Sequence, residues 1–262
     1  MSKANKRERQ RQNRELAKVE RDRLIKRDRQ MRTLRSLLFV LIPVAVIFVV
    51  IYFLNSDDSK AGSTSALSKI HCRNVPKSTK IPKKNTSQTA PPQTLNGAKT
   101  YTATMNTSCG SMTIQLDAAT APIATNNFVY LARSGFYDGL PFHRAAQGFV
   151  IQGGDPKGDG SGGPGYTVVG ELPTDSYPIG SLAAAKSGGA PAGDFGSQFF
   201  IVSGAGGATL PNDYARFGKV TKGLIVAKKI ESFAPPPAQG TTTRDGAPTQ
   251  KVLIDSVTIG EN

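Results

Sequence analysis

A run of 18 uncharged, mostly apolar residues at positions 37–54 constrains this chain more than any other feature of its sequence. As an α-helix the run would be about 27 Å long, which matches the hydrocarbon core of a bilayer. It has no polar face, so a helix packed in a globular core fits it less well. Pro43 is tolerated in membrane helices. The sequence therefore predicts one transmembrane helix over residues 37–54.

Basic residues on the N-terminal side of this run predict its orientation. Residues 1–36 hold 14 Lys/Arg against 5 Asp/Glu. Because positive flanks stay in the cytoplasm, we expect a single-pass protein of the cell membrane with residues 55–262 outside the cytoplasm. A cleaved signal peptide is the alternative, with small residues at positions 61–63. Its basic region and its apolar run would both be longer than usual.

The charge of the chain lies in its extensions. Residues 1–36 contain no Gly or Pro, which favours helix. They predict a solvated basic cytoplasmic tail, or one that contacts anionic lipid or RNA, with lipid the better of these two partners. Residues 98–262 contain 12 basic and 12 acidic residues, so they give no reason to expect nucleic acid as a partner of the main domain.

Residues 55–97 are rich in Ser, Thr, Lys and Pro, and predict a linker that holds a domain at 98–262 away from the membrane. Alternating residues predict strands near 101–106, 112–117, 181–185, 198–202 and 251–259. Pro122 is suited to begin a helix that ends near Ser134, and a second helix follows residue 223. Many strands with two helices predict a mainly-β domain, a closed antiparallel barrel capped at its ends.

The stretch 142–165 reads FHRAAQGFVIQGGDPKGDGSGGPG. Two short strand-like runs flank a turn at Gln147 and Gly148, and a Gly-rich loop follows. Strands joined this tightly place alternate side chains on one face. Arg144, a Phe and Gln152 can therefore point into one groove. A phosphate-binding loop is a weaker reading, since no Gly-Lys-Ser/Thr and no helix start follow.

Three motifs stand in the same order as in a known family. The stretch contains FHR, GF and QGGD, while residues 196–201 read GSQFFI and residues 217–220 read FGKV. In these motifs the chain resembles the cyclophilin family of peptidyl-prolyl cis-trans isomerases. The resemblance implies an eight-stranded antiparallel barrel with two helices. It also implies an enzyme that needs no cofactor and acts on proline-containing polypeptides, here to assist the folding of extracytoplasmic proteins.

The resemblance also assigns roles to individual residues. Arg144 matches the catalytic arginine, which donates a hydrogen bond to the amide nitrogen as it twists, and Gln198 and Phe149 complete the catalytic set. His143 is expected to be structural. The residues expected to bind substrate are Phe149, Val150, Gln152, Ala185, Lys186, Phe200, Leu210 and Tyr214. Phe199 should instead face the core, because neighbours on a strand point oppositely.

Several positions depart from the family pattern. Val150 replaces the usual Met, which leaves a roomier pocket, and Lys186 replaces an Asn and cannot accept a hydrogen bond. Tyr214 replaces a His found in many relatives. Thr209 stands where the best-known members carry Trp, so we expect weak cyclosporin binding or none.

The chain has two cysteines and two histidines, and their spacing matches no common zinc pattern, so no metal site is predicted. Both cysteines, Cys72 and Cys109, fall on the side of the membrane where disulfides persist. A bridge between them is therefore predicted. Two free thiols, or pairing between molecules, are the alternatives.

Two other functions remain compatible with the sequence. A groove altered at Val150 and Lys186 could hold a Pro-containing segment without turnover, as a binding module. Alternatively, the tail and the membrane span could recruit partners, with the domain as a scaffold. The second possibility predicts that Arg144→Ala leaves cell function intact.

Overall fold

A computed structural model describes residues 66–262, which belong to one compact unit that begins at Ser65. The basic tail at 1–36 and the transmembrane helix predicted over 37–54 lie outside the described residues. Among residues 66–262, no helix has the length and apolar character needed to span a bilayer.

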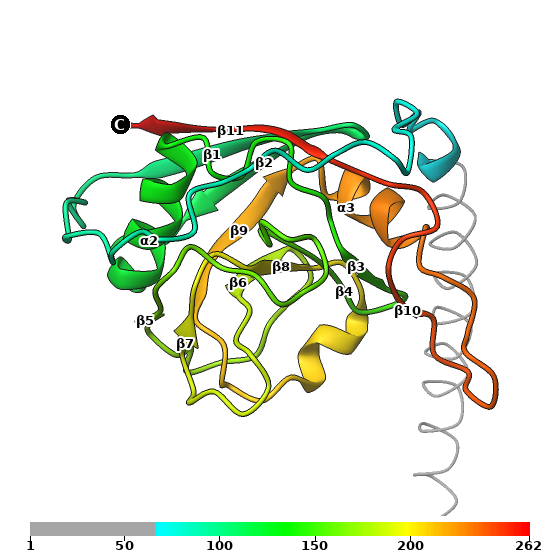
Figure 1. Ribbon diagram of the computed structural model, residues 1–262. Coiled ribbons are helices and arrows are strands. Elements are labelled where there is room, and N and C mark those ends of the chain that lie inside the picture. Colours follow the sequence, from blue (N-terminus) through cyan, green and yellow to red (C-terminus); the bar gives the residue numbers. More distant parts are fainter. Residues whose placement is uncertain (1–65) are drawn as a thin grey trace, which may run out of the picture. The chain divides into compact units, whose positions relative to one another are not determined.

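The compact unit is built on a nine-stranded antiparallel sheet (Figure 1). Its strand order is β10-β3-β4-β8-β6-β9-β2-β1-β11. The strands are β1 (Tyr101–Thr107), β2 (Gly110–Leu116), β3 (Arg144–Ala146), β4 (Val150–Gly153), β6 (Ser181–Ala184), β8 (Phe199–Val202), β9 (Arg216–Lys222), β10 (Asp245–Gly246) and β11 (Ile254–Glu261). A separate two-stranded sheet pairs β5 (Val168–Val169) with β7 (Asp194–Phe195).

The sheet curls so that its two ends approach each other. The Phe142 N–H donates to the Val252 carbonyl at 3.0 Å, and the Ile254 N–H donates to the Leu140 carbonyl at 2.8 Å. The edge strands β10 and β11 nevertheless stand at opposite ends of the strand order. The mainly-β, antiparallel class is as expected, but the sheet has nine strands rather than eight, and strand pairing alone does not close it into a barrel.

Helices α2 (Pro122–Arg133) and α3 (Leu224–Glu231) pack on different parts of the sheet, as Figure 1 shows. Pro122 begins α2 and Ser134 caps its end, as the sequence predicts. Phe128 of α2 reaches into the core, where its ring lies 5.8 Å from that of Phe199 and 5.3 Å from that of Phe217. A short 3₁₀ helix, η1 (Ala205–Thr209), follows β8.

Residues 66–97, predicted as linker, form a strap that packs on the domain. Val75 is buried, and four partly buried apolar residues of the strap contact the main core, namely Ile70, Cys72, Ile81 and Leu95. Asn126 of α2 holds the far end of the strap, since its Oδ1 accepts the Thr94 N–H and its Nδ2 donates to the Pro92 carbonyl, both at 3.0 Å. The compact unit therefore starts well before the boundary expected at residue 98.

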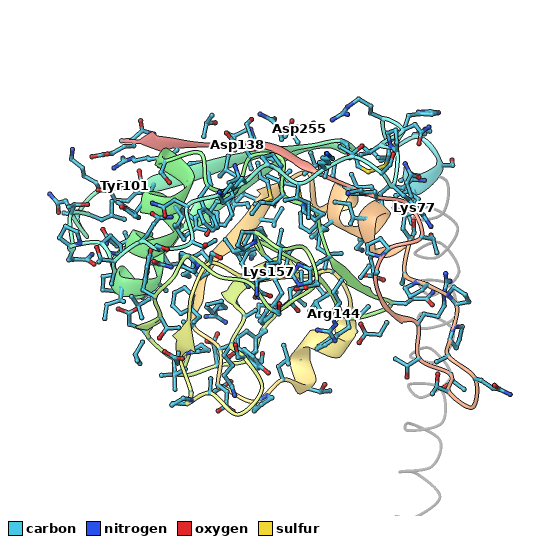
Figure 2. All side chains as sticks on the ribbon, in the orientation of Figure 1. Lys77, Tyr101, Asp138, Arg144, Lys157 and Asp255 are labelled. Atoms are coloured by element: carbon cyan, nitrogen blue, oxygen red, sulfur yellow. A yellow bond between two sulfur atoms is a disulfide. The ribbon has the colours of Figure 1, made fainter. Side chains whose placement is uncertain are left out.

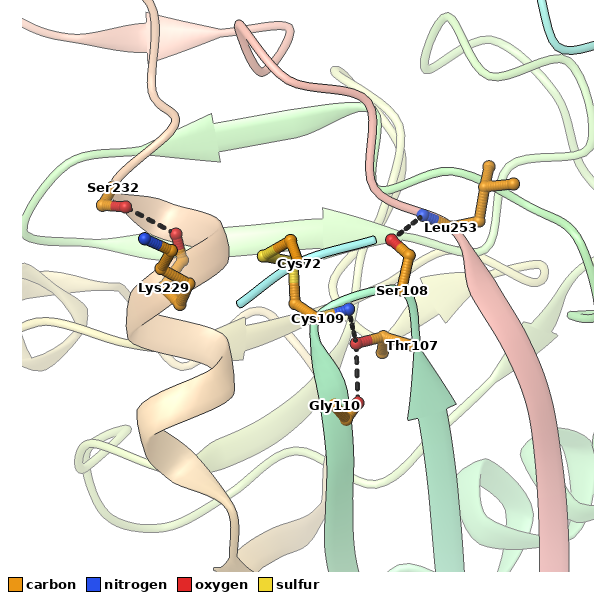
Figure 3. Close-up of a disulfide and its surroundings, with 8 residues drawn as sticks. All are labelled: Cys72, Thr107, Ser108, Cys109, Gly110, Lys229, Ser232 and Leu253. Atoms are coloured by element: carbon orange, nitrogen blue, oxygen red, sulfur yellow. Dashed lines mark hydrogen bonds between the residues drawn. A yellow bond between two sulfur atoms is a disulfide. The ribbon is translucent and has the colours of Figure 1, made fainter. Parts of the chain in front are cut away.

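A disulfide between Cys72 and Cys109 joins the strap to the turn between β1 and β2 (Figure 3). The Arg73 N–H donates to the Ser108 carbonyl at 2.7 Å beside the bridge. In the same turn, Thr107 Oγ1 accepts the Cys109 N–H at 3.1 Å and donates to the Gly110 carbonyl at 2.7 Å. The bridge thus connects two segments that backbone and side-chain hydrogen bonds already hold in place.

Candidate active site

A cavity of about 190 Å³ opens beside β3, β4 and β8. All eight residues predicted to bind substrate line it, and Arg144 lies among them. The lining consists of Arg144, Phe149, Val150, Gln152, Ala185, Lys186, Phe200, Leu210 and Tyr214. The structure therefore gathers in one place residues that the sequence spreads over 70 positions.

Strand register brings the centre of the site together. Arg144 of β3 lies opposite Gln152 of β4, and Gln152 lies opposite Phe200 of β8. Directly opposed residues in an antiparallel sheet point to the same face. One row across three strands thus presents a guanidinium, an amide and an aromatic ring to the same cavity.

The floor of the cavity is apolar. Val150 and Phe200 are buried in a small cluster that is distinct from the main core. Phe199 belongs to the main core instead, as the strand alternation predicts. The ring of Tyr214 stands edge-on to that of Phe200, with the centroids 5.4 Å apart. This floor can hold a proline ring by burying its apolar surface.

Tyr177 supports this floor, and sequence reasoning did not identify it. Its side chain is fully buried, its hydroxyl donates to the Tyr214 carbonyl at 2.8 Å, and the same oxygen accepts the Tyr214 N–H at 3.1 Å. The backbone of Tyr214 is therefore fixed from both sides, and its ring is held at the cavity wall. Tyr177 lies between β5 and β6, outside every motif.

The polar side of the cavity is a hydrogen-bonded row that starts at Arg144. Arg144 Nη1 donates to Gln152 Oε1 at 3.3 Å, and Gln152 Nε2 donates to Gln198 Oε1 at 3.0 Å. Gln198 Nε2 in turn donates to the Gly160 and Gly162 carbonyls, both at 2.9 Å. Gln198 therefore acts on Arg144 through Gln152, and it lines a neighbouring cavity of about 180 Å³ rather than this one.

Asp245 is the second side chain that holds Arg144, and sequence reasoning missed it. Arg144 Nε donates to Asp245 Oδ1 at 2.7 Å and Arg144 Nη2 donates to Asp245 Oδ2 at 2.6 Å. The hydrogen bond to Asp245 raises the pKa of Arg144 above its ordinary value. The guanidinium carbon lies 5.8 Å from the centre of the Phe149 ring, over the cavity wall.

Lys186 lines the cavity on the side of Tyr214. Its Nζ donates to the Ala190 carbonyl at 3.0 Å and lies 5.8 Å from the centre of the Tyr214 ring. Its head group is thus held by its own loop. Ala185, the residue before it, lines both this cavity and the neighbouring one.

His143 stands beside Arg144 in the chain but not in the lining of the cavity. It is partly buried, and burial lowers its pKa from the ordinary value of 6.5. Within the described residues, neither ring nitrogen has a hydrogen-bond partner. Residues 66–262 also contain no group of three or more His, Cys, Asp or Glu side chains placed to hold a metal ion.

Comparison with known proteins points to one family. Residues 102–259 match the family model described as cyclophilin type peptidyl-prolyl cis-trans isomerase. A peptidyl-prolyl cis-trans isomerase of Helicobacter pylori is 41% identical over 141 residues, which cover 51% of this chain and 82% of that protein. Peptidyl-prolyl cis-trans isomerase B of Bacillus subtilis is 46% identical over 114 residues, or 43% of this chain and 77% of that protein.

A solved structure agrees with these relatives. The cyclophilin type isomerase of Cryptosporidium parvum, crystallised in the presence of the dipeptide Ala-Pro, aligns with a TM-score of 0.51 and 31% identity. The alignment covers 62% of this chain and 99% of that structure.

Proposed function

This chain belongs to the cyclophilin family of peptidyl-prolyl cis-trans isomerases, and from that premise we propose that it isomerises Xaa-Pro bonds of extracytoplasmic polypeptides during their folding. The observation that supports this best is the position of Arg144. Its guanidinium lines a cavity of about 190 Å³ that has an apolar floor, and two neighbouring side chains hold it there.

The chemistry needs a binding site and a hydrogen-bond donor. Rotation about an amide bond meets a barrier of about 18–20 kcal/mol, because the C–N bond has double-bond character. No covalent bond breaks, so no nucleophile is required. When the amide twists, its nitrogen becomes pyramidal and gains a free lone pair. Arg144 can donate a hydrogen bond to that lone pair, which stabilises the twisted state over both planar states.

The other lining residues hold the substrate. The apolar floor around Phe200 takes the proline ring, with Phe149 and Leu210 at its wall. Gln152 anchors the flanking backbone and orients Arg144. Each preference of about 1.4 kcal/mol for the twisted state gives a tenfold gain in rate.

The test compares two arginine variants. Arg144→Ala should lower kcat/KM for an Ala-Pro peptide by about 100-fold, the usual loss when one transition-state donor is removed. Arg73→Ala is the matched control, because Arg73 also forms an ion pair, with Asp255, at a distance of 2.6 Å. Full activity in a folded Arg144→Ala variant would refute the assigned mechanism. Peptide binding without turnover in the wild type would favour the binding module instead.

We also propose that the domain is anchored to the membrane and lies outside the cytoplasm. The apolar run at 37–54 and its basic N-terminal flank support this orientation. The Cys72–Cys109 bridge supports it independently, since disulfides persist in extracytoplasmic compartments. Protease added to intact cells should digest the domain while sparing residues 1–36. A protected domain would reverse the orientation, and release into the medium would indicate signal cleavage.

A further inference from the structure

We propose that Asp245 is a positioning residue of the active site, which sets the guanidinium of Arg144 for its role in catalysis. The inference rests on the proposed function and adds a residue to it. Asp245 lies 101 positions beyond Arg144, outside the three family motifs. It brings the segment between α3 and β11 into the reaction.

The pairing of β10 with β3 places the two side chains together. Asp245 lies opposite Ala146, two residues along β3 from Arg144. Residues two apart on a strand share a face, so Asp245 and Arg144 form a diagonal cross-strand pair. Both carboxylate oxygens are used, and the contact is bidentate, the geometry that best fixes the orientation of a guanidinium.

The segment that carries Asp245 is itself anchored. The Gln147 N–H donates to the Arg244 carbonyl at 2.8 Å, one residue before Asp245. The Arg244 side chain reaches back to the start of the segment, donating to the Ala234 carbonyl at 2.5 Å and to the Pro235 carbonyl at 3.2 Å. Asp245 therefore presents its carboxylate from a held backbone rather than from a free loop.

Counting donors shows what remains for substrate. A guanidinium has five N–H groups. Asp245 takes the one on Nε and one on Nη2, and Gln152 takes one on Nη1. Two N–H groups are left, one on each terminal nitrogen. Both sides of the group are fixed, so these donors are oriented before the amide twists.

The contact between Arg144 and Asp245 should affect the rate of isomerisation more than the stability of the fold. The side chains of Arg144 and Asp245 are 35% and 31% exposed, so water screens their attraction. A donor held in place needs no reorganisation at the moment of reaction, whereas a displacement of 1 Å can cost about 100-fold in rate. Gln152 alone, at 3.3 Å, would leave the guanidinium free to turn.

The experiment replaces the carboxylate by an amide of the same size. In the full-length chain, purified in detergent, Asp245→Asn should lower kcat/KM for an Ala-Pro tetrapeptide about tenfold. The Kd for the same peptide should stay within about twofold, since the apolar floor that binds proline is untouched. Asp255→Asn is the matched control, because it also removes a carboxylate from an arginine, and Figure 2 shows Asp255 far from Arg144.

Two further measurements separate positioning from a general structural role. In an Arg144→Ala background, Asp245→Asn should cause no further loss, because the residue acts only through the arginine. The NMR signal of the Arg144 Nε–H should exchange slowly with water in the wild type and quickly in Asp245→Asn. Asp255→Asn should leave that signal unchanged.

The outcomes distinguish this inference from the function on which it rests. A wild-type chain without isomerase activity would overturn both. An active wild type whose Asp245→Asn variant keeps full activity would overturn only the role of Asp245. Increased activity in Asp245→Asn would show that Asp245 keeps Arg144 away from the substrate. An equal loss of activity on adding Asp245→Asn to the Arg144→Ala background would show that Asp245 acts through another group. Either result contradicts the proposal.

Discussion

Removing the Cys72–Cys109 bridge should lower the free energy of unfolding of the domain. The size of the loss depends on the length of the loop that the bridge closes. The two cysteines are separated by 37 residues. In the chain-entropy description, closing a loop of that length lowers the conformational entropy of the unfolded state. This stabilises the folded state by about 4 kcal/mol at 25 °C. For a domain of about 200 residues each kcal/mol moves Tm by about 2–4 °C, so the double variant Cys72→Ser/Cys109→Ser should melt about 8–16 °C lower.

The folded state should change much less. We expect the hydrogen bond from the Arg73 N–H to the Ser108 carbonyl to remain in the double variant, together with the core contacts of Ile70, Ile81 and Leu95, because neither uses the sulfur atoms. Among the described residues, those that line the cavity do not include either cysteine. Well below Tm, the double variant should therefore keep kcat/KM within about twofold of the wild type, since the groups of the site are untouched.

The assay is thermal unfolding of the wild type with and without reductant. The double variant is the control, because reductant should leave its Tm unchanged. Thiol counting on denatured, unreduced protein gives an independent check. Two reactive thiols per chain would rule the bridge out. An unchanged Tm with the bridge present would refute the entropic argument, and a large loss of activity in the folded, reduced protein would show coupling between the bridge and the cavity.

Three further predictions concern the site and its surroundings. Gly204→Ala should lower stability by about 1–3 kcal/mol in denaturant unfolding, because a methyl group there would meet the backbone of Gly148, and an unchanged midpoint would contradict this packing. Burial lowers the pKa of His143, so this side chain binds a proton more readily in the unfolded chain than in the folded one. Tm should therefore fall as the pH drops below about 6.5. His143→Gln should weaken this dependence of Tm on pH more than His71→Gln does. Lys186→Asn restores a hydrogen-bond acceptor at the cavity and should lower KM about fivefold, the effect of one hydrogen bond; an unchanged KM would mean that the substrate does not use this position.

The lining of the cavity was predicted mainly through the resemblance to the cyclophilin family, and strand periodicity explains part of that lining. Arg144, Val150 and Gln152 fall on adjacent strands joined by a tight turn, so their shared face follows from strand periodicity. The same rule explains why Phe199 lies in the main core whereas Phe200 lies in the small cluster at the cavity. In these places, strand periodicity determines which side chains share a face, and the resemblance to the family indicates that this face lines the cavity.

Two parts of the site could not be predicted in this way. Asp245 reaches Arg144 only because β10, a strand of two residues, pairs with β3 across the fold. Two residues carry no periodicity, and the surrounding Gly, Thr and Pro residues are typical of a loop. Tyr177 likewise supports Tyr214 from outside any motif. Both contacts depend on tertiary structure, about which local patterns say little.

The composition of residues 66–97 predicts a linker, and only the apolar residues near Cys72 indicate that part of it packs on the domain. The strap is rich in Pro, Ser, Thr and Lys, and its few apolar residues are spaced too irregularly to form a helix or a strand. Val75 is nevertheless buried, and Ile70, Cys72, Ile81 and Leu95 pack against the main core, although their spacing shows no period.

The strap also supports the active site indirectly. It packs on the loop that holds Gln198, the last member of the hydrogen-bonded row that starts at Arg144. The Gln88 N–H donates to the Pro164 carbonyl at 3.0 Å, and the backbone of Gly165, at a φ of +103°, passes so close to Thr86 that no side chain would fit. The same loop supplies the carbonyls of Gly160 and Gly162 that hold Gln198. A fragment beginning at residue 98 would lose this support together with the disulfide, so low activity in such a fragment would say little about Arg144. A fragment beginning at Ser65 keeps both, and the mechanism should be tested there or in the full chain.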